Sequence, residues 1–252
     1  MLNSENNLLK NGSSQAISLQ ALANFLDEFF AVEEYDSDQN GIYRPSNRPI
    51  KRLGIALEPE MGLADWANTD KLDALFLHRP WRLQIDELSP DVGILSYHLA
   101  FDERLTLGFN PRLANALGLK KLEVLGHKEG RAIGMLGEAV SHEFQTLCDR
   151  VEAIFGGCEQ IRLPAQNTVR RVAVVGAMND ALVREAADRV AQVYITGQWR
   201  QPGELAVTET GIGVIAIGHR RAEDWGLRDL AAILRERWVG LEVLLYSNRS
   251  KD

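Results

Sequence analysis

Residues 53–82, LGIALEPEMGLADWANTDKLDALFLHRPWR, and residues 172–200, VAVVGAMNDALVREAADRVAQVYITGQWR, follow the same plan and decide the fold. Each stretch runs from a short apolar segment through a polar, helix-forming segment to a second apolar segment, and each ends in Trp-Arg. A strand, a helix and a strand in this order form a right-handed crossover with parallel strands. Because the pattern occurs twice, the sequence predicts an internal duplication and two related three-layer α/β lobes.

Other segments extend this plan. Buried strands are expected at 52–57, 74–77, 92–97, 171–176, 191–196, 213–217 and 242–246. Helices are expected at 19–30 with Ser18 as the N-cap, and at 58–72, 110–119, 138–155, 179–190 and 221–238. The run 35–49 is predicted to be a loop, because it is dense in Asp, Asn, Gly and Pro. We expect residues 1–16 to be a disordered lead-in, 17–126 the first lobe and 127–252 the second lobe, with a site at the interface between the lobes.

Composition excludes several classes of function. The formal net charge of −7 disfavours a sequence-independent grip on nucleic acid, which needs a basic face. No window approaches eighteen consecutive apolar residues, so the sequence predicts no membrane span. The two cysteines, Cys148 and Cys158, fit free thiols better than a disulfide framework, which indicates a reducing, cytoplasmic setting.

Chemistry-bearing residues follow the predicted strands. His78, Asp102 and His219 come after strands at 74–77, 92–97 and 213–217, and ligands of α/β sheets bind beyond the carboxyl ends of strands. His219 and Glu223 are four residues apart at the start of a predicted helix, so they lie on one face and can share a cation. A solvent-exposed surface pair is the alternative. His98 and Asp102 repeat the same His-x-x-x-acid spacing in the first lobe.

The segment DSDQNG at 36–41 matches the opening of a calcium-binding loop. The twelfth position would be Asn47 instead of the bidentate Glu that such a loop requires, and Pro45 and Pro49 obstruct the exiting helix. We therefore predict a turn here and not a calcium site.

Together, FLHRP (76–80), HLAFDERLTLGFNPRLANALGL (98–119), VYITG (193–197) and GHRRAE (218–223) resemble the Nif-three-like family. Its members are dinuclear-metal-centre hexameric proteins, also called GTP cyclohydrolase type 2 homologs. The resemblance covers most of the chain and implies metal ligands at four matching positions, His78, Asp102, His219 and Glu223. It places His98 near the site, and it implies a homohexamer.

This sequence departs from the family pattern where a ligand is expected. The family has His-His-Pro after the strand, but the second histidine is Arg79 here, and a guanidinium has no lone pair for a metal. Leu99-Ala100-Phe101 replaces the family's Thr-Asn-Leu beside Asp102. One hypothesis is a single divalent ion, Zn²⁺, Mn²⁺ or Fe²⁺, held by His78, His219 and Glu223, with the charge of Arg79 in place of the second ion and opposite Asp102. The alternative is that no metal binds and Arg79 neutralises both acids.

The sequence is consistent with two functions. One is a scaffold that keeps the assembly and a degenerate metal centre without turnover. The other is a metal-dependent hydrolase of a small nucleotide-like or phosphorylated substrate, in which His98 or Glu223 would move protons. The substrate, the pathway and any partner other than a second copy of the chain stay undefined.

Overall fold

The computed structural model describes residues 17–140 and 143–247, and it divides into two compact units. The first unit is formed by Met1–Ala100 and Leu227–Asp252, and the second by Phe101–Gly226. The predicted lead-in at 1–16 lies outside the described residues. The predicted boundary after residue 126 falls inside the second unit. The sequence-based division followed chain order, whereas the last strand of the chain returns to the first sheet and pairs with its β2 strand.

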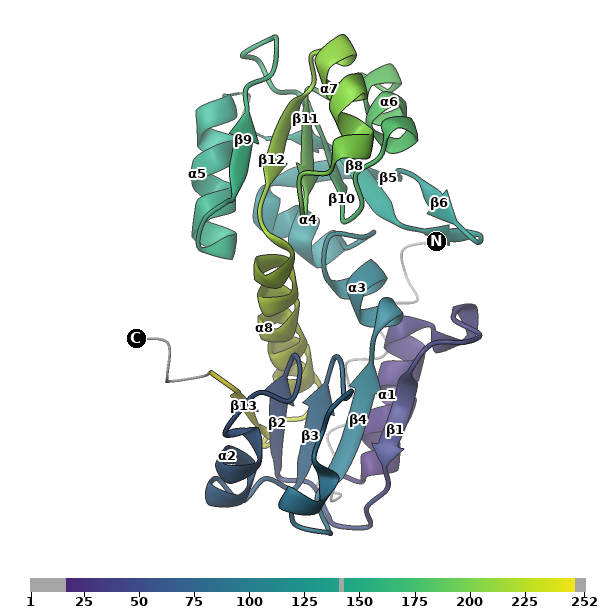
Figure 1. Ribbon diagram of the computed structural model, residues 1–252, viewed down its shortest axis with the longest axis vertical. Helices are drawn as coiled ribbons and strands as arrows, with labels where there is room; N and C mark the ends of the chain where they lie inside the picture. The colour runs from purple at the N-terminus through teal and green to yellow at the C-terminus, as the bar shows by residue number, and fades with distance from the viewer. Residues whose placement is uncertain (1–16, 141–142, 248–252) are drawn as a thin grey trace. The chain divides into compact units, whose positions relative to one another are not determined.

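The first unit is built on a five-stranded sheet with the order β1-β4-β3-β2-β13 (Figure 1). Its strands are β1 (Asn40–Arg44), β2 (Arg52–Ala56), β3 (Ala74–Leu77), β4 (Gly93–Tyr97) and β13 (Glu242–Leu245). Strands β13, β2, β3 and β4 are parallel, and β1 pairs antiparallel with β4. Helix α1 (Leu19–Phe30) and helix α2 (Leu63–Thr69) cover opposite faces.

Both faces of this sheet are apolar, which is why its strands appear in the sequence as continuous hydrophobic runs. On one face, α2 packs on alternating strand residues such as Leu75, Leu77 and Ile94. On the other face, the rings of Phe30 and Phe76 lie 5.2 and 5.9 Å from the ring of Tyr97. This unit therefore has the three layers that the sequence predicts.

The second unit is built on a six-stranded sheet with the order β5-β8-β10-β11-β12-β9. Its strands are β5 (Leu119–Val124), β8 (Gly134–Ala139), β9 (Gln160–Arg162), β10 (Arg171–Val175), β11 (Val193–Thr196) and β12 (Gly213–Ala216). Strands β6 (His127–Lys128) and β7 (Arg131–Ala132) form a two-stranded sheet of their own, at the end of the β5–β8 pair. Strands β10, β11 and β12 are parallel, and β8 and β9 flank them in the antiparallel sense.

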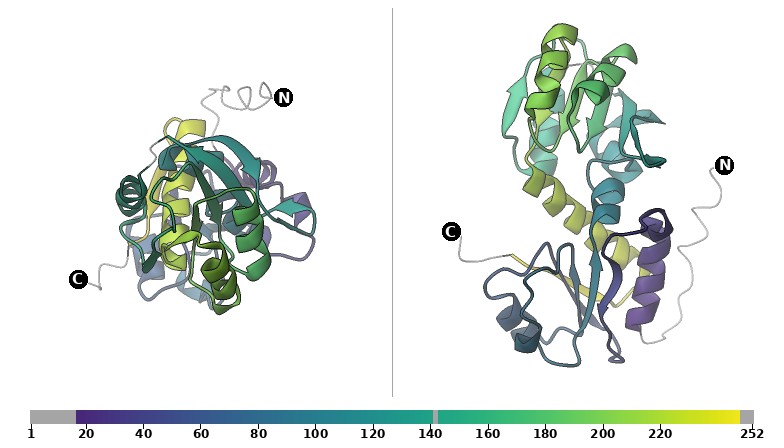
Figure 2. Two further views of the ribbon diagram at one scale, coloured as in Figure 1. Left: turned by 90° about the horizontal axis from the view of Figure 1, so that it is seen from above. Right: turned by 45° about the vertical axis from the view of Figure 1, so that its right-hand side comes forward.

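Helices cover both faces of the second sheet as well. Helices α6 (Asp180–Asp188) and α7 (Glu204–Thr210) pack side by side on one face, as the two green helices of Figure 2 show. Helices α4 (Pro111–Leu117) and α5 (Phe144–Phe155) pack on the other. The remaining helices are α3 (Leu99–Leu105), α8 (His219–Arg237) and three short 3₁₀ turns, Val32–Glu34, Ile85–Glu87 and Gln201–Gly203. The chain passes from one unit to the other within α3 and again within α8.

The two units share a topology. In each, a helix and an antiparallel edge strand (α1 and β1, or α5 and β9) precede three parallel strands, and the edge strand pairs with the last of the three. The same main-chain anchor also recurs. Asp73 before β3 accepts hydrogen bonds from two backbone N–H groups at the start of β2, and Gln192 before β11 does the same at the start of β10. A shared detail of this kind supports the predicted duplication.

Several predicted elements need correction. The predicted loop 35–49 contains β1, an edge strand whose half-exposed residues hide the strand pattern and whose pairing partner is distant in sequence. The predicted helix 138–155 begins only at Phe144, because Glu138 and Ala139 belong to β8 and pair with β5 and β10. The other predicted strands are confirmed within two residues at each end, and Ser18 caps α1 as expected. No helix among residues 17–140 and 143–247 is both long and apolar enough to cross a membrane.

Candidate metal centre

Three of the four predicted ligands come together in the second unit. Asp102, His219 and Glu223 each offer one donor atom, and the three atoms lie within 4.8 Å of one another. His219 Nε2 is 3.0 Å from Glu223 Oε1, as expected for residues one helical turn apart. The His219 side chain is 50 % exposed, whereas Glu223 is only 1 % exposed. Solvent can therefore reach the group at the His219 imidazole but not at the Glu223 carboxylate.

Local sequence explains why these side chains converge. Strand β12 ends at Ala216, and Gly218 turns the chain into α8 with a φ of +100°, which a residue with a Cβ rarely adopts. Further along α8, Gly226 faces α3, where an added Cβ would lie 2.8 Å from Phe101 Cζ. The absent side chain lets α8 approach α3, so Asp102 reaches the face that carries Glu223. A glycine inside a predicted amphipathic helix was the signal for this close approach.

The donor set fits a divalent cation. Two carboxylates and one imidazole suit Zn²⁺, Mn²⁺ or Fe²⁺. A carboxylate as buried as Glu223 needs a compensating charge or hydrogen bonds, because removing it from water is costly.

The first unit holds the other two histidines of the predicted site, His78 and His98. His78 follows β3 and is completely buried, and its Nδ1 lies 2.9 Å from the carbonyl oxygen of Tyr97. A carbonyl only accepts hydrogen bonds, so Nδ1 carries the proton and the lone pair of the neutral ring is on Nε2. This tautomer is common in metal-binding histidines. The ring of His98 lies 5.2 Å from that of His78.

His98 has a carboxylate partner that the sequence analysis missed. Its Nδ1 is 2.9 Å from Asp38 Oδ1, and Asp38 Oδ2 also accepts a hydrogen bond from the N–H of Leu99 at 2.5 Å. The half-exposed indole of Trp81 lies edge-to-face with the His98 ring at 4.9 Å. Asp38 belongs to the segment predicted as a turn, and no local spacing rule connects it with a histidine sixty residues later.

Arg79 is anchored at the end of β3. Its backbone N–H donates to the carbonyl of Leu57 at 2.7 Å, and its Nε lies 3.7 Å from Glu58 Oε2. Since that ion pair is long and half-exposed on the Glu58 side, it contributes little to stability. The pairing of Arg79 with Asp102 remains a prediction.

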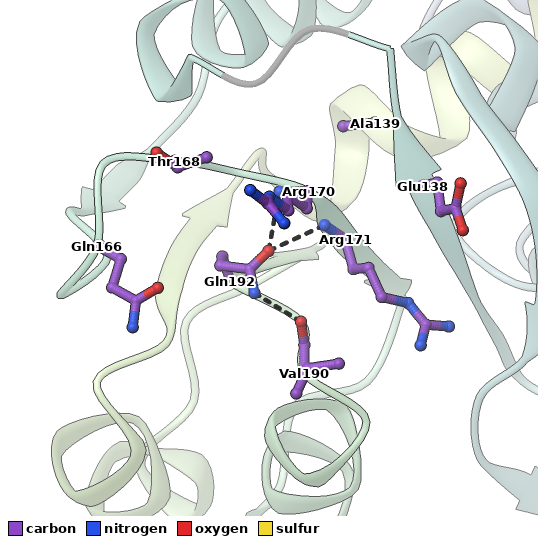
Figure 3. Close-up of a pocket in the computed structure, with 8 residues that line it drawn as sticks. All are labelled: Glu138, Ala139, Gln166, Thr168, Arg170, Arg171, Val190 and Gln192. Atoms are coloured by element: carbon purple, nitrogen blue, oxygen red, sulfur yellow. Dashed lines mark hydrogen bonds between the residues drawn. The ribbon is translucent and has the colours of Figure 1, made fainter.

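A pocket of about 750 Å³ lies elsewhere in the second unit (Figure 3). It sits at the amino ends of β10 and β11, and none of the predicted site residues lines it. The side-chain oxygen of Gln192 accepts hydrogen bonds from the backbone N–H groups of Arg170 and Arg171, and its Nε2 donates to the carbonyl of Val190. Arg171 donates to Glu123. These side chains are committed to holding the ends of the strands, so the pocket does not replace the metal centre as the candidate site.

The sequence is similar to known proteins over most of its length. A family model described as Duf34/NIF3 (NGG1p interacting factor 3) matches residues 17–251. A protein of Pyrococcus abyssi called GTP cyclohydrolase 1 type 2 homolog is 24 % identical over 239 residues, which cover 87 % of this chain and 94 % of that protein. A protein of the same name from Neisseria meningitidis is 26 % identical over 227 residues, 82 % of this chain and 88 % of the relative.

Solved structures show the same fold. The protein ybgI, described as of unknown function, has a TM-score of 0.74 and 21 % identity, with 94 % of this chain and all of that chain covered. Reduced HcgD from Methanocaldococcus jannaschii has a TM-score of 0.72 and 19 % identity at the same coverage.

Proposed function

Since this chain belongs to the Duf34/NIF3 family, we propose that it is a metal-binding scaffold that holds one divalent cation through Asp102, His219 and Glu223. The convergence of these three donors within 4.8 Å is the observation that supports the proposal. His78 belongs to the first unit, and its role as a further ligand stays a prediction from the family resemblance.

The positions of the three ligands determine how a bound cation would stabilise the fold. Asp102 lies on α3, and His219 and Glu223 lie on the first two turns of α8. A shared cation would tie the two helices through which the chain passes from one unit to the other. Two carboxylates in close proximity repel each other, so neutralising them stabilises the folded chain. Self-association into a homohexamer completes the scaffold proposal, on the family resemblance alone, and light scattering on the purified chain tests it.

Arg79 limits the proposed centre to one ion. A guanidinium has no lone pair to donate to a metal ion. A second cation would therefore need a histidine at this position.

Metal content tests this proposal directly. Protein purified without chelator or nickel affinity should contain about one equivalent of divalent metal by plasma mass spectrometry. The metal content of the Arg79→His variant should rise towards two equivalents, and that of His219→Ala should fall to the level of a protein-free blank. His127→Ala, a histidine on the exposed β6 strand, is the matched control and should keep the native content. Native protein without metal after incubation with Zn²⁺, Mn²⁺ or Fe²⁺ would overturn the proposal.

A second candidate function is metal-dependent hydrolysis of a small nucleotide-like or phosphorylated substrate. The bond between His98 and Asp38 favours it, because a histidine oriented by a carboxylate is a common arrangement for moving protons. A divalent cation supplies Lewis acidity and lowers the pKa of a coordinated water. In this candidate function His98 accepts a proton at Nε2, and Glu223 is the second group that could carry one. The names of the relatives point to GTP as the first substrate to assay.

One comparison of the native protein with a variant distinguishes the two functions. Because the proposal does not use His98 as a ligand, His98→Gln should retain both the fold and the metal content of the native protein. If metal-loaded native protein hydrolyses GTP or a nucleoside monophosphate and His98→Gln does not, the chain is a hydrolase. Metal binding without turnover by the native protein leaves the scaffold function.

A further inference from the structure

We propose that Asp38 is the positioning residue that fixes His98 as its Nδ1–H tautomer and so makes Nε2 its proton-accepting atom. The inference rests on the hydrolytic candidate function for its catalytic consequence. The tautomer itself is a property of the metal-free chain, so it can be tested separately.

The backbone brings Asp38 to this place. The pairing of β1 with β4 continues beyond the strand ends, where the N–H of His98 donates to the carbonyl of Gln39 at 3.2 Å. Asp38 is the next residue, so its position beside His98 is set by the same antiparallel ladder. All of these residues belong to the first unit.

The Asp38 carboxylate contacts two donors with its two oxygens. Oδ1 lies 2.9 Å from His98 Nδ1, and Oδ2 accepts from the Leu99 N–H at the start of α3. The side chains of Asp38 and His98 are only 12 % and 21 % exposed, so water competes weakly for either group. An ionised carboxylate accepts hydrogen bonds and donates none, and a proton must therefore lie on Nδ1 of His98.

Two aromatic rings lie beside the imidazole of His98. The ring of His98 is flanked by His78 at 5.2 Å and by Trp81 at 4.9 Å, both measured between ring centres. Trp81 is 51 % exposed, so the flank that it forms reaches the surface of this unit. A neutral imidazole with its proton on Nδ1 has its lone pair on Nε2, the atom that a general base uses.

An amide at position 38 distinguishes positioning from a purely structural role. Asparagine has one accepting oxygen and one donating nitrogen, so it can keep the hydrogen bond to the Leu99 N–H while its NH₂ faces His98 Nδ1. Asp38→Asn should therefore preserve the start of α3 but invert the tautomer of His98. If Asp38 served only as a cap for α3, the same variant would leave His98 unchanged.

Solid-state NMR on protein labelled with ¹⁵N in its histidine rings measures this directly, whatever the size of the assembly. Spectra are recorded on the metal-free 252-residue chain at about pH 9, where an ordinary imidazole is neutral. His98→Gln identifies the two signals of His98 by their loss. Asp36→Asn, at an exposed acid in the same loop, is the matched control.

The native protein should show a protonated Nδ1 and an unprotonated Nε2 for His98, unchanged in Asp36→Asn and inverted in Asp38→Asn. A native His98 with its proton on Nε2, or no change in Asp38→Asn, would overturn the inference. In metal-loaded protein with measurable hydrolysis, Asp38→Asn should lower kcat by about 10²–10⁴-fold at unchanged metal content. If the native protein has no hydrolytic activity while the tautomers behave as stated, the hydrolytic function fails and the role of Asp38 in fixing the tautomer stands.

Discussion

Replacing His219 by alanine removes one proposed ligand without disturbing the core of the second unit. The side chain is 50 % exposed at the first residue of α8, and its contact with the buried Glu223 is the 3.0 Å approach of Nε2. His219 also compensates the buried Glu223 carboxylate, so its loss should lower the free energy of unfolding of the metal-free protein by about 1–3 kcal/mol. The Tm of each protein is therefore compared with and without metal, and His219 remains a better test position than Glu223, which is fully buried.

The effect of added metal should differ strongly between the two proteins. A cation at about 100 times its Kd stabilises the folded state by about 2.7 kcal/mol. For a chain of this length, each kcal/mol raises Tm by about 2–4 °C, so the native Tm should rise by about 5–11 °C. Loss of even an outer-shell partner weakens metal binding by about 10–100-fold, and loss of a ligand should weaken it by at least the upper value. The same metal concentration then stabilises His219→Ala by only about 0.4 kcal/mol, a rise in Tm of about 1 °C.

Thermal unfolding of chelator-treated protein, with and without Zn²⁺ or Mn²⁺, measures both quantities. His127→Ala controls for the loss of an exposed histidine and should respond to metal as the native protein does. A full metal-dependent rise in the His219→Ala variant would exclude His219 as a ligand. The absence of any rise in the native protein would refute the metal centre itself.

Three further outcomes follow from particular contacts. Tyr97→Phe removes the hydroxyl that donates to Asp27 Oδ1 at 2.7 Å, and should lower the free energy of unfolding by about 1.5–3 kcal/mol in urea titrations. Burial raises the pKa of the Tyr97 phenol well above its ordinary value, so this loss should be the same at pH 7 and pH 9. Burial also raises the pKa of the Cys148 thiol to about 11. Only about 0.1 % is then thiolate at pH 8, so Cys148 should react with Ellman's reagent on the order of 100-fold more slowly than an ordinary exposed thiol. Gly226→Ala should push Phe101 away from α8, destabilise the fold by about 1–3 kcal/mol and weaken cation binding without altering a ligand, as calorimetric titration would show.

The parallel strands could be predicted because they are buried on both faces. Strands β3 and β11 consist entirely of buried residues, so they appear in the sequence as short continuous apolar runs between polar segments. Edge strands lack this signal. β1 is half-exposed and lies in a segment rich in turn-forming residues, and only its pairing with β4 makes it a strand. β8 carries Gly137, which packs against Leu119 Cβ, and such a constraint comes from the tertiary structure alone.

One part of the candidate site depends on local contacts, and another part depends on contacts between residues that are distant in sequence. His219 and Glu223 could be predicted from their four-residue spacing, because helix geometry alone brings them together. Asp38 could not, because its contact with His98 depends on the pairing of β1 with β4. The two His-x-x-x-acid segments also occupy different positions in the repeat. His98 is the fifth residue after Gly93 and His219 is the sixth after Gly213, although the two glycines hold equivalent places in their sheets.

That offset of one residue gives the two histidines different surroundings and, in our proposals, different roles. In the first unit, His98 directly follows the strand and lies before α3, where the loop around Asp38 can reach it. In the second unit, Gly218 turns the chain, and His219 becomes the first residue of α8, in line with Glu223. A histidine before the helix can be held by a carboxylate from another segment and is suited to moving a proton. A histidine inside the helix shares its face with an acid four residues later and is suited to binding a cation. A one-residue insertion before His98 that moved it into α3 would therefore be expected to exchange the first role for the second.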